Sequence, residues 1–273
     1  MTKSFSIAVL LTCHNRREKT IACLESLFVN PLPKQYHLDV FLVDDGSTDG
    51  TGDMVKERFP SVNVIQGAGS LYWNGGMRLA WETATSLKKF DFYLWLNDDT
   101  ILLKKALITL VDKGIATLGN HILVGATRSP KGDITYSGYR YFDTKLTPDG
   151  SWQFCDYFNG NIVLVPSLVF KKVGFLDRVY RHALGDFDYG IRAKKLGFVH
   201  LLAPEALGVC DGHDRAPIWR NSDYPIGRRF RHLYSPLGNN PFEFFIFDKR
   251  QNGIYKALIH FLSIHLRLIF PKL

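Results

Sequence analysis

The chain has 273 residues, of which 46% are hydrophobic and 14% aromatic, a composition that excludes an intrinsically disordered protein. Its formal net charge of +8 is uneven, because residues 215–273 hold ten Lys and Arg against three acids, a net of +7. The rest of the chain is therefore close to neutral. No stretch reaches the roughly 18 uncharged apolar residues of a spanning helix, so we expect a protein that is soluble or attached to a membrane surface.

Apolar runs alternate with stretches of helical spacing along the first half of the chain. The pattern predicts strands at residues 6–12, 37–45, 62–67 and 90–99, and helices at residues 18–28, 51–59, 76–87 and 102–119. Such alternation is typical of a parallel sheet covered by helices on both faces.

The first apolar run, "FSIAVLLTC", resembles a short signal or lipoprotein segment, but "HNRREK" follows it at once. A buried strand and the start of a helix explain this order better. The four cysteines, at positions 13, 23, 155 and 210, include no C-x-x-C pair, so we expect reduced thiols and a cytoplasmic protein.

The second half is less regular. We expect a strand at residues 161–165, a short helix after Pro166, and a helix with acids at its start over "GDFDYGIRAKKLGF". "FVHLLAPEALGVC" reads as extended, and residues 254–269 as a closing helix.

Unusual polar residues follow three of the predicted strands, in "TCHN", "VDDGSTDGT" and "LNDDT". In sheets of this kind, ligands bind outside the carboxyl ends of the strands, so these clusters should share one crevice.

Two of the clusters contain adjacent carboxylates, Asp44–Asp45 and Asp98–Asp99, which repel each other unless a positive group lies nearby. Asn and Asp favour turns, so capped turns are one explanation. The other is Mg²⁺ or Mn²⁺, which binds one or two carboxylates and is completed by substrate phosphates. The spacing fits neither an EF-hand loop nor the D-x-D-G-T of haloacid dehalogenase phosphatases.

Four segments resemble, in type and order, motifs of the inverting family 2 glycosyltransferases: "VDDGSTDGT", "NDD", "FNGNIVLVPSLVFKKVGFLD" and "GDFDYGIRAKKLGF". Bacterial polysaccharide, O-antigen and capsule sugar transferases, including rhamnosyltransferase-like enzymes, are of this kind. The resemblance implies an α/β GT-A fold with a mostly parallel central sheet. It covers about residues 5–215, so we expect a catalytic domain over 1–215, with a nucleotide-sugar half to about residue 100 and an acceptor half from 101. Residues 216–273 then form a basic, helical C-terminal extension.

The resemblance also implies roles for individual residues. Asp99 matches the usual metal ligand, with Mn²⁺ or Mg²⁺ as the cofactor, and His213 lies where some members place a metal-binding histidine. A surface histidine in a turn explains His213 equally well. The implied nucleotide-binding residues are Thr12, Asn15, Arg16, Asp44, Asp45, Asn74, Gly75, Arg78 and Asp98.

The catalytic base of the family is an acid in an E-D-x-D or similar motif, where this chain reads Gly185-Asp186-Phe187-Asp188. Asp186 is the best match and Asp188 the second choice. A carboxylate there can take the proton of an attacking hydroxyl. Asp186 could instead be an ordinary helix N-cap. Trp73 and Trp152 are candidates for stacking on sugars, although large aromatic residues are more often core residues.

Apolar residues recur at helical spacing in residues 254–269, with Lys, Arg and His between them. A basic amphipathic helix can bind an anionic membrane, here the inner face of the cell membrane, or pack on its own domain or a partner subunit. Nucleic acid is not an expected partner, because no binding motif accompanies the charge.

The resemblance therefore implies a metal-dependent, inverting hexosyltransferase that moves one sugar from a nucleotide-diphosphate donor to a glycan or a lipid-linked acceptor in bacterial surface polysaccharide synthesis. UDP is the expected nucleotide, with dTDP and GDP as alternatives. The competing functions are a metal-dependent nucleotidyltransferase or sugar-nucleotide hydrolase, and a non-catalytic nucleotide- or sugar-binding module. The sugar, the acceptor and the oligomeric state leave no signature in the sequence.

Overall fold

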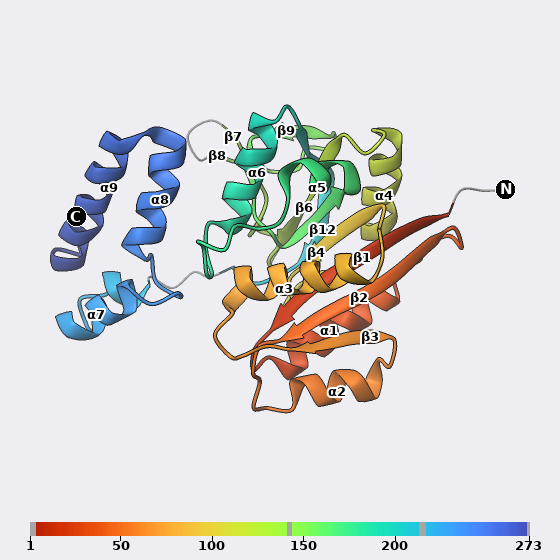
Figure 1. Ribbon diagram of the computed structural model, residues 1–273, viewed down its shortest axis with the longest axis horizontal. Coiled ribbons are helices and arrows are strands. Elements are labelled where there is room, and N and C mark those ends of the chain that lie inside the picture. The colour runs from red at the N-terminus through yellow and green to blue at the C-terminus, as the bar shows by residue number, and fades with distance from the viewer. Residues whose placement is uncertain (1–3, 141–143, 213–216, 272–273) are drawn as a thin grey trace.

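The computed structural model describes residues 4–140, 144–212 and 217–271. Figure 1 shows a central sheet with helices on both faces, and further helices of the C-terminal segment to one side. The strands are β1 (Phe5–Cys13), β2 (Tyr36–Asp44), β3 (Val62–Gln66), β4 (Phe92–Leu96), β5 (Ile101–Leu102), β6 (His121–Arg128), β7 (Gly138–Arg140), β8 (Thr144–Lys145), β9 (Gln153–Cys155), β10 (Tyr157–Phe158), β11 (Ile162–Pro166) and β12 (Val199–Val209). The helices are α1 (Arg17–Phe28), α2 (Thr51–Arg58), α3 (Tyr72–Leu87), α4 (Ala106–Ala116), α5 (Ser167–Val173), α6 (Gly185–Lys195), α7 (Ile226–Leu233), α8 (Pro241–Asn252) and α9 (Ile254–Ile269).

The main sheet runs in the order β3-β2-β1-β4-β11-β6-β12-β5, with β9 paired to β12. Strands β3, β2, β1 and β4 are parallel, whereas β11 lies antiparallel between β4 and β6. A smaller sheet joins β10, β7 and β8. The predicted α/β fold with a mostly parallel central sheet is confirmed.

Side chains on the two faces of the sheet enter two different cores, as the alternation along a strand requires. On β1, Val9 and Leu11 pack with α1, α2 and α4, while Ala8 and Leu10 pack with α3, α5 and α6. Trp81 of α3 lies at the centre of the second core. Its ring contacts those of Tyr93, Trp95, Phe170, Phe175 and Tyr189.

The C-terminal helices have a small core of their own, built from Trp219, Leu233, Ile264 and Leu268. Helix α8 attaches them to the body, because Arg250 binds Asp177 at 2.8 Å and Glu243 binds Arg181 at 2.7 Å. Figure 1 shows α9 on the far side of α8 from the sheet.

Most predicted elements form within a few residues of their expected bounds, and α9 spans Ile254–Ile269 as predicted. Helix α3 begins four residues earlier than predicted, at Tyr72, because Asp45 accepts hydrogen bonds from backbone N–H groups at its start. Strand β6 and helices α7 and α8 were not predicted. All four cysteines are free and buried. None of the helices in the described part of the chain has both the length and the apolarity that crossing a bilayer requires.

Candidate active site

The ends of three parallel strands bring the polar clusters together. Cys13 at the end of β1 pairs in register with Asp44 at the end of β2, and Leu10 of β1 pairs with Trp95 near the end of β4. The clusters after β1, β2 and β4 therefore meet at one edge of the sheet, as predicted.

A pocket of about 390 Å³ opens at this edge. Its lining comes from the strand ends, the start of α3, the segment before α6 and the C-terminal extension. The lining residues are Thr12, Cys13, His14, Arg16, Asp45, Gly69, Tyr72, Trp73, Asp98, His182 and Leu237. Four of the predicted nucleotide-binding residues, Thr12, Arg16, Asp45 and Asp98, are among them. The sequence patterns did not indicate Tyr72, His182 or Leu237 as site residues.

The Asp44–Asp45 pair is held by backbone amides. One Asp45 carboxylate oxygen accepts from the Gly69 N–H at 2.7 Å, and the other accepts from Leu71 at 2.8 Å and Tyr72 at 3.0 Å. Asp44 accepts from the Ser47 N–H at 3.0 Å. Donors of this kind favour the charged carboxylate and order the loop under the pocket.

The Asp98–Asp99 pair faces a cation from the protein itself. The Arg16 guanidinium lies 2.8 Å from an Asp99 oxygen and 3.3 Å from an Asp98 oxygen. The preceding residue, Asn15, does not line this pocket but a separate cavity, and its side-chain oxygen accepts from the Thr48 N–H at 2.7 Å. The positive group that two adjacent carboxylates require is thus Arg16 in this structure.

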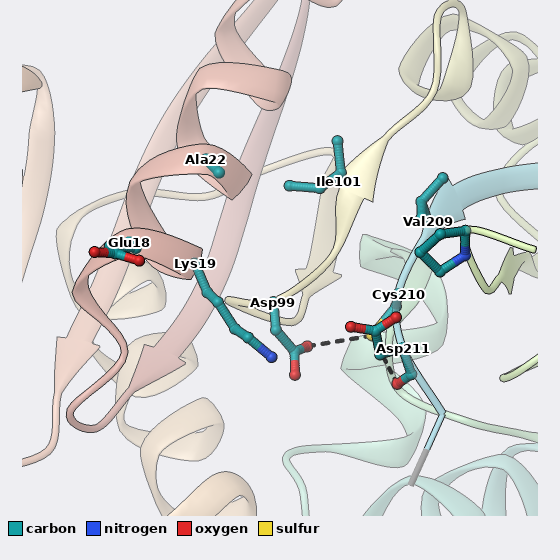
Figure 2. A pocket seen from close by; sticks show the side chains of 9 residues that line it. Glu18, Lys19, Ala22, Asp99, Ile101, Val209, Cys210 and Asp211 are labelled. Carbon is teal, nitrogen blue, oxygen red and sulfur yellow. Dashed lines mark hydrogen bonds between the residues drawn. The ribbon is translucent and has the colours of Figure 1, made fainter. Parts of the chain in front are cut away.

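Asp98 and Asp99 differ in burial. Asp98 is buried, and this burial raises its pKa to about 7 against the opposing effect of Arg16. Asp99 lines a separate cavity of about 310 Å³, in which Lys19 extends toward it (Figure 2). There the Cys210 thiol donates to the other Asp99 oxygen at 3.5 Å. The two adjacent acids therefore line different cavities: Asp98 lines the pocket at the strand ends and Asp99 the second one.

Asp186 occupies the first turn of α6 beside the pocket. Its two carboxylate oxygens accept from the backbone N–H groups of Gly160 at 2.8 Å and Phe187 at 2.9 Å. Burial raises its pKa to about 6, although these two hydrogen bonds oppose the shift. A side chain at Gly160 would lie 2.5 Å from the Trp73 ring, so Asp186 is adjacent to an aromatic residue of the pocket.

Four other predicted residues do not line the pocket. Asn74 is buried and donates to the carbonyl oxygens of Asp177 and Tyr180 at 2.8 and 2.7 Å. Asp188 is fully buried and pairs with Arg192 at 2.7 Å, which makes it a structural residue. Arg78 pairs with Glu82 at 2.7 Å and lines a different cavity. Gly75 lies in the first turn of α3, where an added Cβ would be 3.3 Å from that of Leu71, the residue before the helix. His213 lies outside the described residues.

The chain alone provides few ligands for a metal. Within residues 4–140, 144–212 and 217–271, no group of three or more His, Cys, Asp or Glu side chains could hold an ion. The Asp98 and Asp99 oxygens suit a hard divalent cation that substrate phosphates complete, which is the usual arrangement for Mg²⁺. The donor set fits such an ion only together with a substrate.

Comparison with known proteins shows a family match for the sequence and similar folds for the structure. A family model described as "Glycosyl transferase family 2" matches residues 8–171. No curated protein sequence matches the chain. The structure is similar to GalNAc-T7 with UDP, GalNAc and Mn²⁺, at a TM-score of 0.60 and 13% identity over 85% of this chain and 48% of that one.

Two further solved structures are similar over most of both chains. The mannosyltransferase PcManGT from Pyrobaculum calidifontis, with GDP-Man and Mn²⁺, has a TM-score of 0.58 and 16% identity over 98% of this chain and 70% of its own. S. aureus TarS residues 1–349, with UDP-GlcNAc, has a TM-score of 0.59 and 14% identity over 95% and 81%. At these identities the likeness shows the GT-A fold. The chain spans about half the length of the GalNAc-T7 chain.

Proposed function

This chain belongs to glycosyl transferase family 2, and from that premise we propose that it moves one sugar, with inversion, from a nucleotide-diphosphate donor to an acceptor hydroxyl. Mn²⁺ or Mg²⁺ is the proposed cofactor. GalNAc-T7 and PcManGT, which share the fold, were solved with Mn²⁺ and a nucleotide or nucleotide sugar. The proposed acceptor is a glycan or a lipid-linked sugar of a bacterial surface polysaccharide.

The observation that carries the proposal is the Arg16 bridge between Asp98 and Asp99. Binding of a metal diphosphate could break the ion pairs of Arg16 with Asp98 and Asp99 and give each group a ligand atom as its new partner. Asp98 and Asp99 would then hold the metal, and Arg16 would bind the phosphates, for which its guanidinium is well suited. When bound, the metal would stabilise the charge of the leaving diphosphate.

Asp186 is the proposed general base. The acceptor oxygen attacks the anomeric carbon, the bond from that carbon to the phosphate oxygen breaks, and the acceptor proton passes to Asp186. A carboxyl group with a pKa of about 6 is ionised at neutral pH and more basic than an ordinary aspartate. Trp73, whose indole N–H donates to Asn97 at 2.7 Å, is held rigidly beside it as a wall for the sugar.

Two measurements on the wild type and three variants test this proposal. The first is thermal stabilisation by UDP, dTDP, GDP and CDP with and without Mn²⁺, since ligand at a hundredfold excess over Kd adds about 2.7 kcal/mol of stability. We expect Asp99→Asn to lose the Mn²⁺-dependent shift and Asp186→Asn to keep it. Asp53→Asn, an exposed acid of α2, is the matched control.

The second measurement is release of the nucleotide from its sugar donor with and without candidate acceptors. We expect Asp186→Asn to lose at least about a hundredfold in rate while still binding donor. Release that needs no acceptor would favour a sugar-nucleotide hydrolase, and incorporation of the nucleotide into product would favour a nucleotidyltransferase. Binding without turnover in any assay would favour a binding module.

A further inference from the structure

Helix α9 carries large apolar side chains on its exposed face. Five of them, spaced three and four residues apart, form one line along the helix, and each is between 52% and 81% exposed. We call this line the α9 apolar stripe; its residues are Tyr255, Ile259, Leu262, Leu266 and Ile269. At about 100° per residue, the spacing places all five within a sector of roughly 80°.

The stripe is not the face that holds α9 in the protein. Ala257, Ile264 and Leu268 are buried, and the same spacing places them on the opposite side of the helix. Ile264 and Leu268 complete the small core with Trp219 and Leu233. The helix therefore has one apolar face that packs on the extension and a second whose side chains are each more than half exposed.

The surroundings of the stripe are positively charged. Helix α9 contains Lys256 and Arg267 and has no acidic residue. Of the three acids between residues 215 and 273, Glu243 is paired with Arg181 and Asp248 with His260. Ten Lys and Arg residues in the same segment leave its net charge at +7. Arg228 and Arg231 of α7 are both exposed and add further positive charge to the extension.

We propose that the α9 apolar stripe docks on the surface of an anionic lipid bilayer. A helix with an exposed apolar face and a basic flank lies in the plane of such a surface, with its apolar side chains among the acyl chains. Negatively charged lipids attract nearby Lys and Arg. A second copy of the chain is the poorer occupant, because two segments of charge +7 would repel each other across the contact.

The position of α9 suits this role. It lies at the outer edge of the molecule, so a flat surface can reach it without meeting the sheet domain (Figure 1). The same extension contributes Leu237 to the pocket at the strand ends. Docking through α9 would hold that pocket close to the bilayer, although the lipid contact itself does not depend on the proposed transferase reaction.

Flotation of the full chain with lipid vesicles tests the proposal. The vesicles are phosphatidylcholine alone and phosphatidylcholine with 30% phosphatidylglycerol, each at 0.1 and 0.5 M NaCl. We expect the protein to partition onto the anionic vesicles at least about tenfold better than onto the neutral ones, and high salt to reduce this preference. The double variant Ile259→Asp/Leu262→Asp should lose at least about tenfold of the partition.

The matched control is Leu87→Asp/Leu118→Asp, which changes two exposed leucines of the body and should bind as the wild type does. Thermal unfolding of both double variants checks that they fold. Equal binding to both vesicle types, or undiminished binding by Ile259→Asp/Leu262→Asp, would overturn the proposal. A different result would also overturn the proposal: no vesicle binds the protein, the wild type sediments as a dimer, and Ile259→Asp/Leu262→Asp sediments as a monomer. The stripe would then contact a second copy of the chain.

Discussion

Arg16 sets the electrostatics of the acidic strand end. Arg16 lies between Asp98 and Asp99, where its charge offsets their repulsion. Because the same guanidinium occupies the oxygens that a metal needs, Arg16 must also compete with a divalent cation. If Arg16 binds the phosphates of a nucleotide diphosphate instead, it no longer competes with the cation for the Asp98 and Asp99 oxygens.

We therefore expect Arg16→Met to bind Mn²⁺ more tightly than the wild type when no nucleotide is present. An interaction of about 1 kcal/mol between the charges, a low value for this distance, corresponds to about a fivefold lower Kd. Arg17→Met is the control, since the Arg17 guanidinium contacts the carbonyl oxygen of Asp49 and neither acid of the pair. Titration of free Mn²⁺ by electron paramagnetic resonance measures both. Equal Kd values for the two variants would show that Arg16 does not compete.

The raised pKa of Asp186 predicts the acidic side of the pH–rate profile. A general base acts only when ionised, so kcat should fall as the pH drops through about 6, tenfold for each further unit. An ordinary aspartate would keep its activity to about pH 4. The measurement is kcat at saturating donor and Mn²⁺ between pH 4.5 and 8. A profile that stays flat to pH 4.5 would exclude Asp186 as the base.

At the scale of elements, the contact between α3 and α6 explains why a glycine stands where related motifs have an acid. A side chain at Gly185 would place its Cβ 1.8 Å from the Asn74 oxygen. The Asn74 side chain is held in place, because its amide nitrogen donates hydrogen bonds to two backbone carbonyl oxygens. Gly185 thus lets α6 begin beside α3 and carry Asp186 to the pocket.

Gly185→Ala should lower the free energy of unfolding by about 1–3 kcal/mol, the usual cost of overpacking. Gly227→Ala is the matched control, since its Cβ would meet nothing within 4 Å and Ala is the better helix former. Urea unfolding of both variants and the wild type gives the comparison. If the two substitutions have the same effect, Asn74 does not restrict this position.

Elements with a strong local pattern were predictable from sequence, and elements that depend on distant partners were not. The run in β1 is long and apolar, and α9 has apolar residues at helical spacing on two faces. Strand β6, by contrast, has only a short apolar run before Gly125, and its place between β11 and β12 comes from long-range pairing. Helix α7 has eight residues with three arginines and requires the contacts of Arg229 with Trp219 and Leu268.

The same distinction applies to the site. Motifs at strand ends were predictable because parallel strands end at a common edge. The tertiary position of a side chain within a motif was not, so Asn74 and Asp188 are buried supports although they belong to the motifs. Residues that reach the pocket from far along the chain, such as His182 and Leu237, carry no local signal.

At the scale of the whole molecule, the C-terminal extension is joined to the site as well as to the body. Arg250 and Glu243 of α8 hold the segment between α5 and α6, from which His182 lines the pocket. The turn between α7 and α8 adds Leu237. A ligand in this pocket would therefore touch both the sheet domain and the extension.

Leu237 should accordingly affect substrate binding more than chemistry. Leu237→Asp replaces an apolar side chain of the pocket with a negative charge where a diphosphate donor would bind, so we expect KM for the donor to rise about tenfold or more with a smaller change in kcat. Leu266→Asp makes the same change at an exposed leucine of α9 and should leave KM unchanged in an assay with a water-soluble acceptor. If Leu237→Asp had the same KM and kcat as the wild type, the extension would lie beside the site without contributing to donor binding.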